Sequence, residues 1–234
     1  MKGEEIKRIK TYVRGLDRLI QNGIPEETVT LIVGLPGTMK SSLAFSILYN
    51  NSIHEKIGGL YVSLEQSAPS LIDNMAGLGM KLDKYNELLQ ILDLGLIRRK
   101  LQQMTAQAWI EVFKAYISNL HEKSGFKLLV IDSLPVMEML AKFKEPREDL
   151  FYLFEWLREM KLTTFLIHEM EKNDTAFAKF GEDFLSDGIF HLDLRRDINT
   201  VNLFLSVMKL RKTNHRREYY PLIFDTKGFE IVTD

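Results

Sequence analysis

The sequence predicts an α/β fold with a mostly parallel sheet, on two observations. Short, strongly apolar segments alternate with longer segments that have helical spacing. After residue 188 the pattern changes, and short strand-like segments follow one another closely. Apolar strands that alternate with amphipathic helices are typical of a parallel sheet buried on both faces. The closely spaced segments at the end of the chain predict antiparallel strands at one edge.

The individual elements follow from the same patterns. Strands of the parallel part are predicted at 28–33, 59–64, 128–132 and 163–168, and helices at 41–51, 69–79, 108–123 and 148–160. The C-terminal strand candidates are 188–196, 200–210, 219–224 and 228–232. Residues 92–105 are interpreted as a strand followed by a loop and the start of a helix.

Composition narrows the class of protein. The 234 residues carry a net charge of −1 and no cysteine, which excludes disulfides, thiolate metal sites and a globally basic surface. No apolar run is long enough to cross a bilayer, and the N-terminus lacks the apolar core of a signal peptide. We therefore expect a cytoplasmic protein without membrane contact. Residues 1–14 are predicted to form an arm or linker, and residues 15–234 a single domain.

The segment GLPGTMKSS, residues 34–42, is similar to the phosphate-binding template G-x-x-x-x-G-K-[ST]. It follows a predicted strand and precedes a predicted helix, as such a loop requires. Backbone N–H groups would then face phosphate oxygens, and the helix N-terminus would add a favourable field. Lys40 is expected to reach the terminal phosphates, and the Ser41 hydroxyl to ligate Mg²⁺.

Met39 departs from this template, which has glycine before the lysine. Glycine allows a close approach of the backbone or an unusual dihedral angle. If Met39 belongs to the first helical turn, it adds bulk near the phosphates but no backbone strain. We therefore expect nucleotide binding to survive with an altered affinity or rate.

Two acidic residues follow predicted strands. Asp132 ends the segment LLVID and is a candidate to hold Mg²⁺ through a water or through the Ser41 hydroxyl. Glu65 follows the segment at 59–64, at the edge of the sheet where active-site residues of open α/β folds collect. A general base needs a carboxylate near the attacking water, and Glu65 is the candidate.

The conjunction of motifs resembles the KaiC-type branch of the RecA/RadA ATPases. The motifs are GLPGTMKSS, YVSLEQS and LLVIDS, the entry segment 14–34, the segment EDFLSDGIFHL and the tail KLRKTNH with the strands after it. The likeness extends over about residues 11–232. It implies a RecA-like P-loop NTPase core, ATP or ADP with Mg²⁺ as cofactors, and a homo-oligomeric ring, commonly a hexamer, with nucleotide between subunits.

The resemblance also implies roles for particular residues. Nucleotide would contact Gly34, Pro36, Gly37, Thr38, Met39, Lys40, Ser41 and Ser42, with Ser41 and Asp132 at the metal. Glu65 matches the first of two adjacent glutamates that polarise water, and the second is Gln66 here, so slow hydrolysis is expected. Lys209 and Arg211 match finger residues that reach the nucleotide of the adjacent subunit. His215 is a candidate to position the nucleotide, and Lys212 replaces a glycine of the family pattern.

These features predict a slow, regulatory ATPase that signals to an unidentified protein partner. Met39 and Gln66 leave open a nucleotide sensor with negligible hydrolysis. A recombination accessory protein that binds single-stranded DNA is the third hypothesis. Against it, residues 169–187 hold six acidic residues and two lysines, the reverse of a groove that follows a phosphate backbone, and none of the 14 phenylalanines begins an F-x-x-A motif.

Overall fold

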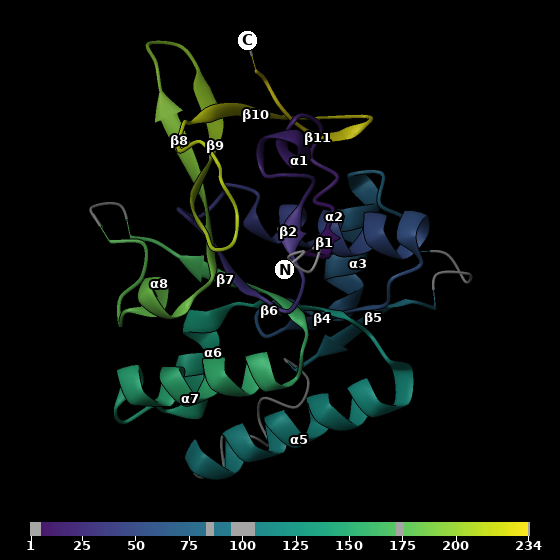
Figure 1. The fold of residues 1–234 in the computed structure, drawn as a ribbon, viewed down its shortest axis with the longest axis vertical. Helices are drawn as coiled ribbons and strands as arrows, with labels where there is room; N and C mark the ends of the chain where they lie inside the picture. The colour runs from purple at the N-terminus through teal and green to yellow at the C-terminus, as the bar shows by residue number, and fades with distance from the viewer. Residues whose placement is uncertain (1–5, 83–86, 95–105, 172–175, 234) are drawn as a thin grey trace, which may run out of the picture.

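A computed structural model describes residues 6–82, 87–94, 106–171 and 176–233. Its centre is a nine-stranded sheet with the order β11-β10-β9-β8-β3-β7-β6-β4-β5 (Figure 1). The parallel strands are β3 (Val29–Gly34), β4 (Gly59–Ser63), β5 (Leu89–Asp93), β6 (Leu128–Asp132), β7 (Thr163–Glu169) and β8 (Gly188–Arg196). The predicted α/β class with a mostly parallel sheet is confirmed.

Helices cover both faces of this sheet (Figure 1). On one face lie α2 (Lys40–Asn50), its π-helical continuation η1 (Asn51–Glu55) and α3 (Ala68–Gly77). On the other face lie α5 (Ala106–Ser124), α6 (Leu134–Ala141) and α7 (Pro146–Glu159). Each face has its own buried cluster of apolar side chains, which is why strands such as β3 are apolar at every position.

The C-terminal strands form the antiparallel edge that the sequence predicts. They are β9 (Val201–Leu210), β10 (Tyr220–Asp225) and β11 (Gly228–Ile231). β8 belongs to both parts of the sheet, because it pairs in parallel with β3 and antiparallel with β9. The short helix α8 (Glu182–Leu185) precedes β8.

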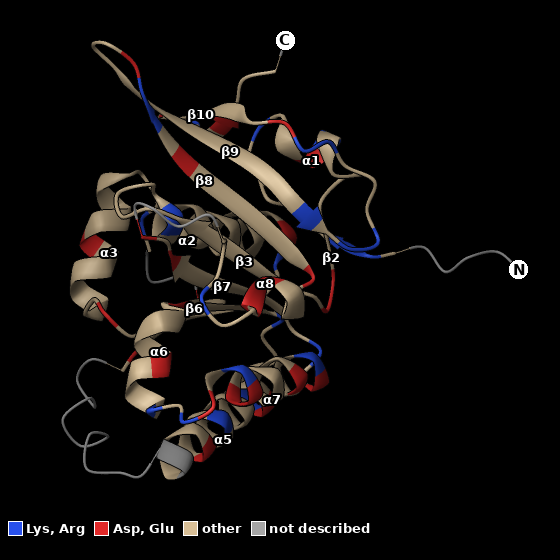
Figure 2. Cartoon of the chain, turned by 90° about the vertical axis from the view of Figure 1, so that its left-hand side faces the viewer, with Lys and Arg blue, Asp and Glu red and all other residues tan. Residues whose placement is uncertain are grey.

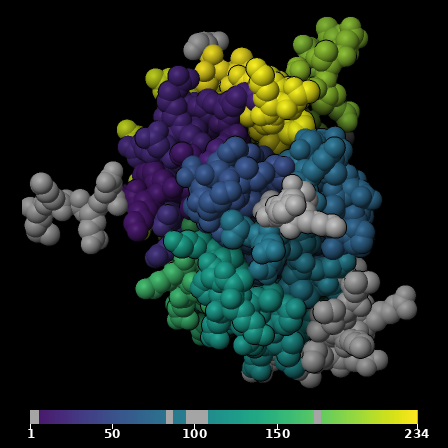
Figure 3. All heavy atoms as spheres, turned by 90° about the vertical axis from the view of Figure 1, so that its right-hand side faces the viewer, coloured from purple at the N-terminus to yellow at the C-terminus, as the bar shows by residue number. Residues whose placement is uncertain are grey.

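The N-terminal segment lies against the domain from residue 7 onward, where the Lys7 carbonyl accepts a hydrogen bond from the Glu26 N–H. Strand β1 (Arg8–Ile9) pairs with β2 (Ile24–Pro25), and the short helix α1 (Leu16–Leu19) lies between them in the chain. Ile9 and Val13 are buried in the core. Arg14 contacts Glu230 of β11 at 2.5 Å, and Figure 3 shows the N-terminal residues directly beside the C-terminal ones.

Most predicted boundaries agree with the structure to within a few residues. β5 covers the start of the segment 92–105, and residues 95–105 lie outside the described residues.

Lysines and arginines intermix with acidic residues over α5 and α7 (Figure 2). Among the described helices, none combines the length and the apolar character needed to span a bilayer.

Candidate active site at the ends of β3, β4 and β6

The predicted phosphate-binding loop lies between β3 and α2. Gly34 ends β3 beside Leu192 of β8, and an added Cβ would lie 2.3 Å from the Leu192 carbonyl oxygen. A side chain at residue 34 would therefore force β3 and β8 apart. Pro36 and Gly37 are exposed at the tip of the loop, and Gly37 has a φ of +84°. Thr38 is buried, whereas Ser42 in the first turn of α2 is half-buried.

Lys40 is hydrogen-bonded to the backbone of this loop. Its Nζ donates a hydrogen bond to the Leu35 carbonyl at 2.9 Å, and that carbonyl also accepts one from Thr38 Oγ1 at 2.8 Å. The Lys40 side chain is almost buried, and burial lowers its pKa. The carboxylates of Glu169, Asp132 and Glu65 act in the opposite direction. The ammonium therefore bonds a carbonyl oxygen that a bound phosphate could replace, in the field of three carboxylates.

Met39 does not belong to the first helical turn, the case in which it would carry no backbone strain. It precedes the first residue of α2 with φ 62° and ψ 26°, in the left-handed region. Glycine adopts this conformation freely, whereas other residues lose about 1–2 kcal/mol there. Met39 therefore keeps the backbone conformation that the template's glycine would take, with strain and with a side chain packed against the core.

Asp132 lies beside the loop because β6 is parallel to β3 and β4, and it pairs with Ser63 of β4. Tyr61 donates its hydroxyl to Asp132 Oδ2 at 2.5 Å. Burial raises the pKa of Asp132, hydrogen bonds from Tyr61 and Ser41 lower it, and Glu65 raises it. The contact between Ser41 and Asp132 places a hydroxyl and a carboxylate together. Hard oxygen ligands of this kind suit Mg²⁺.

Glu65 lies next to this pair. The Leu64 N–H donates to the Asp132 carbonyl at 2.7 Å, which holds the end of β4 against β6. Ser133 donates its hydroxyl to Glu65 Oε1, and the Glu65 side chain is otherwise exposed. Gln66 Nε2 instead donates to Ser70 Oγ at 2.8 Å. Glu65, Lys40, Ser41 and Asp132 are therefore brought together, and the Gln66 amide is engaged by α3.

Three residues of this site were missed in the sequence. Tyr61 and Ser133 orient Asp132 and Glu65, and Glu169 is the carboxylate with the largest charge effect on Lys40. Glu169 ends β7 and pairs in register with Gly34, the first residue of the loop. The register of β3 and β7 decides this contact, and no local motif reports it.

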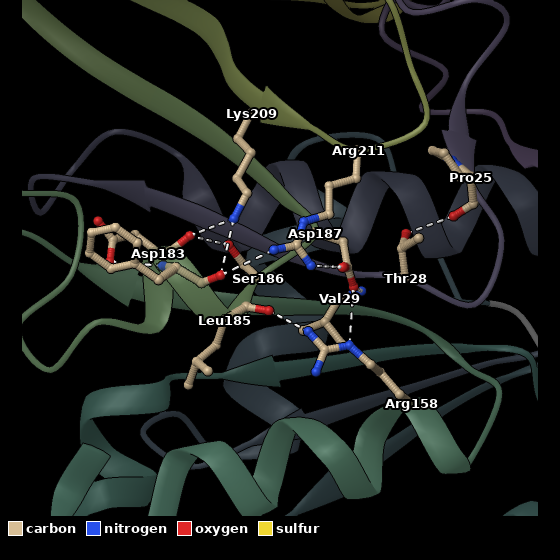
Figure 4. A network of polar contacts seen from close by, with 11 residues as sticks. Pro25, Thr28, Val29, Arg158, Asp183, Leu185, Ser186, Asp187, Lys209 and Arg211 are labelled. Carbon is tan, nitrogen blue, oxygen red and sulfur yellow. Dashed lines mark hydrogen bonds and ion pairs between the residues drawn. The ribbon is translucent and has the colours of Figure 1, made fainter. Parts of the chain in front are cut away.

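Lys209 and Arg211 lie elsewhere, in a polar network around α8 (Figure 4). Lys209 Nζ donates to the Asp183 carbonyl at 2.8 Å, and Arg211 Nη1 lies 3.0 Å from Asp187 Oδ1. Asp187 also accepts a hydrogen bond from the Val29 N–H at 3.0 Å and lies 3.6 Å from Arg158 Nε. Burial, followed by the charge of Arg211, lowers the pKa of Lys209.

This network lies at the amino end of β3, whereas the predicted phosphate loop lies at the carboxyl end of the same strand. Lys209 pairs with Ile189, which pairs with Leu31, and the Asp187 side chain bonds Val29 at the start of β3. The loop begins after Gly34, at the far end of β3. With about 3.3 Å per residue, Leu31 lies about 10 Å and Val29 about 16 Å before Gly34 along the strand. The cations of one chain are thus remote from its own loop.

The turn after Arg211 is held by the N-terminal segment. Lys212 has a φ of +57°, so it takes the left-handed conformation that the family's glycine would favour. Arg8 donates to the Lys212 carbonyl at 3.0 Å and to Thr213 Oγ1 at 2.9 Å. His215 is half-buried in this turn, and its Nδ1 lies 3.2 Å from the Arg216 carbonyl. His215 is therefore also remote from the loop of its own chain.

Two of the six acidic residues between 169 and 187 are internal. Glu182 is fully buried, and Asp187 is 8% exposed and ion-paired. The surface charge of this segment is therefore less acidic than the count of residues suggests. Lys172 and Asp174, which entered the same count, lie outside the described residues.

The fold defines the class of protein, a RecA-like α/β domain, and its predicted phosphate-binding loop lies at the carboxyl end of the parallel strands. The family model described as "ATPase: KaiC" matches residues 9–234. The chain belongs to the KaiC family of ATPases, and membership in that family implies nucleotide binding.

Relatives of known sequence or structure agree with this assignment. A KaiC-like protein of Pyrococcus horikoshii has a crystal structure that superposes with a TM-score of 0.84 at 28% identity, over 98% of this chain and 100% of the other. A UPF0273 protein of Pyrococcus furiosus is 27% identical over 98% of this chain and 95% of its own length. The circadian clock protein KaiC2 of Synechocystis is 26% identical over 95% of this chain, which spans 39% of it.

Proposed function

We propose that this protein binds ATP with Mg²⁺ between the subunits of a homo-oligomeric ring, commonly a hexamer in the family, and hydrolyses it slowly as a regulatory switch. The observation that carries the proposal is the convergence of Lys40, Ser41 and Asp132 beside Glu65. Nucleotide state would alter the contacts between subunits, and an unidentified protein partner would respond to that change.

Different residues of the chain would bind the phosphates, hold the metal ion and activate water. Loop N–H groups between Gly34 and Ser42 bind the phosphates, and Lys40 leaves the Leu35 carbonyl to pair with them. Ser41 and Asp132 would hold Mg²⁺, which neutralises charge on the phosphates when bound. Glu65, oriented by Ser133, accepts a proton from the attacking water.

The proposal of a ring rests on the separation of the cations from the loop. Along β3, Lys209 is level with Leu31, about 10 Å before Gly34, and Arg211 is level with Val29, about 16 Å before it. A head-to-tail neighbour can present this edge to the loop of the next subunit, whereas a single chain cannot. Positive charge supplied by a neighbouring subunit stabilises the transition state of phosphoryl transfer and raises its rate strongly.

Phosphate release by the native chain and by Lys40→Ala tests the enzymatic part. The native chain is expected to release phosphate slowly and Lys40→Ala at background. Equal rates would remove the ATPase from the proposal.

A nucleotide sensor without turnover is the second candidate, and the Gln66 geometry favours it. Residue 66 is glutamine and its amide bonds Ser70, so Glu65 is the one carboxylate of the family's pair in this chain. The sensor predicts nucleotide-dependent assembly with negligible phosphate release. Turnover of several per minute that Glu65→Gln abolishes would exclude it.

A further inference from the structure

A second cluster of ligand-type side chains lies near the phosphate loop. Glu138 of α6, His168 of β7 and Glu182 of α8 place one potential ligand atom each within 4.8 Å of the others. Glu138 and His168 line a cavity of about 1220 Å³ that Leu35 and Pro36 of the loop also border. Three separate elements therefore converge on one point, apart from Ser41 and Asp132.

Glu182 is the most constrained member of this cluster. Its side chain is fully buried, and Oε2 accepts a hydrogen bond from the Phe180 N–H at 2.7 Å. Its other oxygen, Oε1, has no hydrogen-bond donor among the described residues and lies 4.0 Å from His168 Nδ1. A buried carboxylate oxygen without a donor or cation is costly, so this atom points to a missing partner.

Glu138 adds a second carboxylate in contact with the first. Burial, followed by the charge and contact of Glu182, raises the pKa of Glu138 to about 8, and Lys179 lowers it. Two carboxylates this close in a buried place require either a shared proton or a cation between them. The imidazole of His168 beside them favours the cation, because imidazole is a common ligand of transition metals.

We propose that Glu138, His168 and Glu182 bind a zinc-class divalent cation, at a site separate from the nucleotide's magnesium. Zinc takes imidazole nitrogen and carboxylate oxygen at about 2.0–2.2 Å, which places tetrahedral ligands about 3.4 Å apart. The 4.0 Å between His168 and Glu182 needs only a small contraction to reach this geometry. The ion would fix α8, whose Asp183 carbonyl holds Lys209.

Calorimetric titration of the full chain with Zn²⁺ alone tests this site, after treatment with a chelator and without nucleotide. We expect one ion per chain, and at least a tenfold weaker binding in Glu138→Gln and Glu182→Gln. Two control variants are expected to bind Zn²⁺ like the native chain. They are Glu148→Gln, which changes an exposed side chain of α7, and Asp132→Asn. Unchanged affinity in Glu182→Gln, or loss of binding in Asp132→Asn, would overturn the assignment.

Thermal melting separates a ligand role from a folding defect. Zn²⁺ is expected to raise the Tm of the native chain but not that of folded Glu138→Gln, whose half-buried position tolerates the amide better than Glu182 would. The proposal is wrong if Zn²⁺ leaves the native Tm unchanged while the substitution Glu138→Gln by itself raises the Tm. A proton shared between Glu138 and Glu182 would then explain how the two carboxylates lie together.

Discussion

Arg211 Nη1 lies 3.0 Å from Asp187 Oδ1 in the same chain, and Asp187 is bonded to the first residue of β3. The ion pair anchors Arg211 beside the amino end of β3, at the opposite end of that strand from its own phosphate loop. Lys209 is held nearby by carbonyls at the end of α8. This arrangement makes the proposed function depend on a neighbouring subunit.

Mixing two inactive variants tests this dependence. Arg211→Ala keeps its loop but lacks the cation, and Lys40→Ala keeps the cation but lacks the loop lysine. In a randomly mixed ring about a quarter of the interfaces combine an intact loop with an intact Arg211, so phosphate release should return. The matched control for the basic turn is Arg216→Ala, because the Arg216 side chain is 73% exposed and its Nη1 lies 3.9 Å from Glu218 Oε2. Recovery that never exceeds the sum of the separate variants contradicts action between subunits.

Glu65→Gln is expected to lower phosphate release by about 100-fold, because the amide cannot accept a proton from water. Nucleotide affinity should change little, since Glu65 is exposed and its described hydrogen-bond partner is Ser133. Steady-state turnover together with equilibrium binding separates the two effects. A parallel loss of both would mean that Glu65 shapes the loop instead of activating water.

Met39 offers a test of backbone strain. With φ at +62°, Met39→Gly should be more stable than Met39→Ala by about 1 kcal/mol, because both remove the side chain but only glycine relieves the left-handed strain. Denaturant unfolding of the two variants measures the difference. If alanine is equal to or better than glycine, residue 39 is not left-handed in solution.

His191 predicts a pH dependence of stability. Burial lowers its pKa below the ordinary 6.5, Asp193 opposes this shift, and Arg195 reinforces it. Its Nδ1 is 2.8 Å from the Tyr219 hydroxyl, and its ring contacts Phe177. The folded state then binds fewer protons than the unfolded state near pH 6, so stability falls as the pH drops through the lowered pKa.

Melting temperatures of the native chain and His191→Gln measure this effect between about pH 7.5 and pH 5.5. The native chain should lose more stability over that interval than the variant. Identical slopes would show that His191 is not responsible.

Sequence patterns predicted the local features of this fold well. The strand before the loop, the loop itself and Asp132 at the end of β6 each follow from a few consecutive residues, and the structure has all three together. Apolar runs and turn residues carry that information because burial on both faces of a parallel sheet leaves few alternatives.

Features set by strand register could not be predicted in this way. Glu169 meets Gly34 because β7 pairs with β3, and Glu138, His168 and Glu182 meet through three separate elements. The left-handed Met39 is a further case, since methionine rarely adopts that conformation and the sequence left the dihedral angles of residue 39 open. Local sequence reports neither long-range pairing nor an imposed dihedral angle.

Calorimetric titration with Mg²⁺ and ATP, on the native chain and on Lys40→Ala, measures nucleotide binding at the loop itself. The proposed nucleotide site predicts saturable binding by the native chain and an affinity lower by about 100-fold in Lys40→Ala, which loses the buried ammonium that now bonds the Leu35 carbonyl. Equal affinities in the two proteins, or no binding by the native chain, would contradict it.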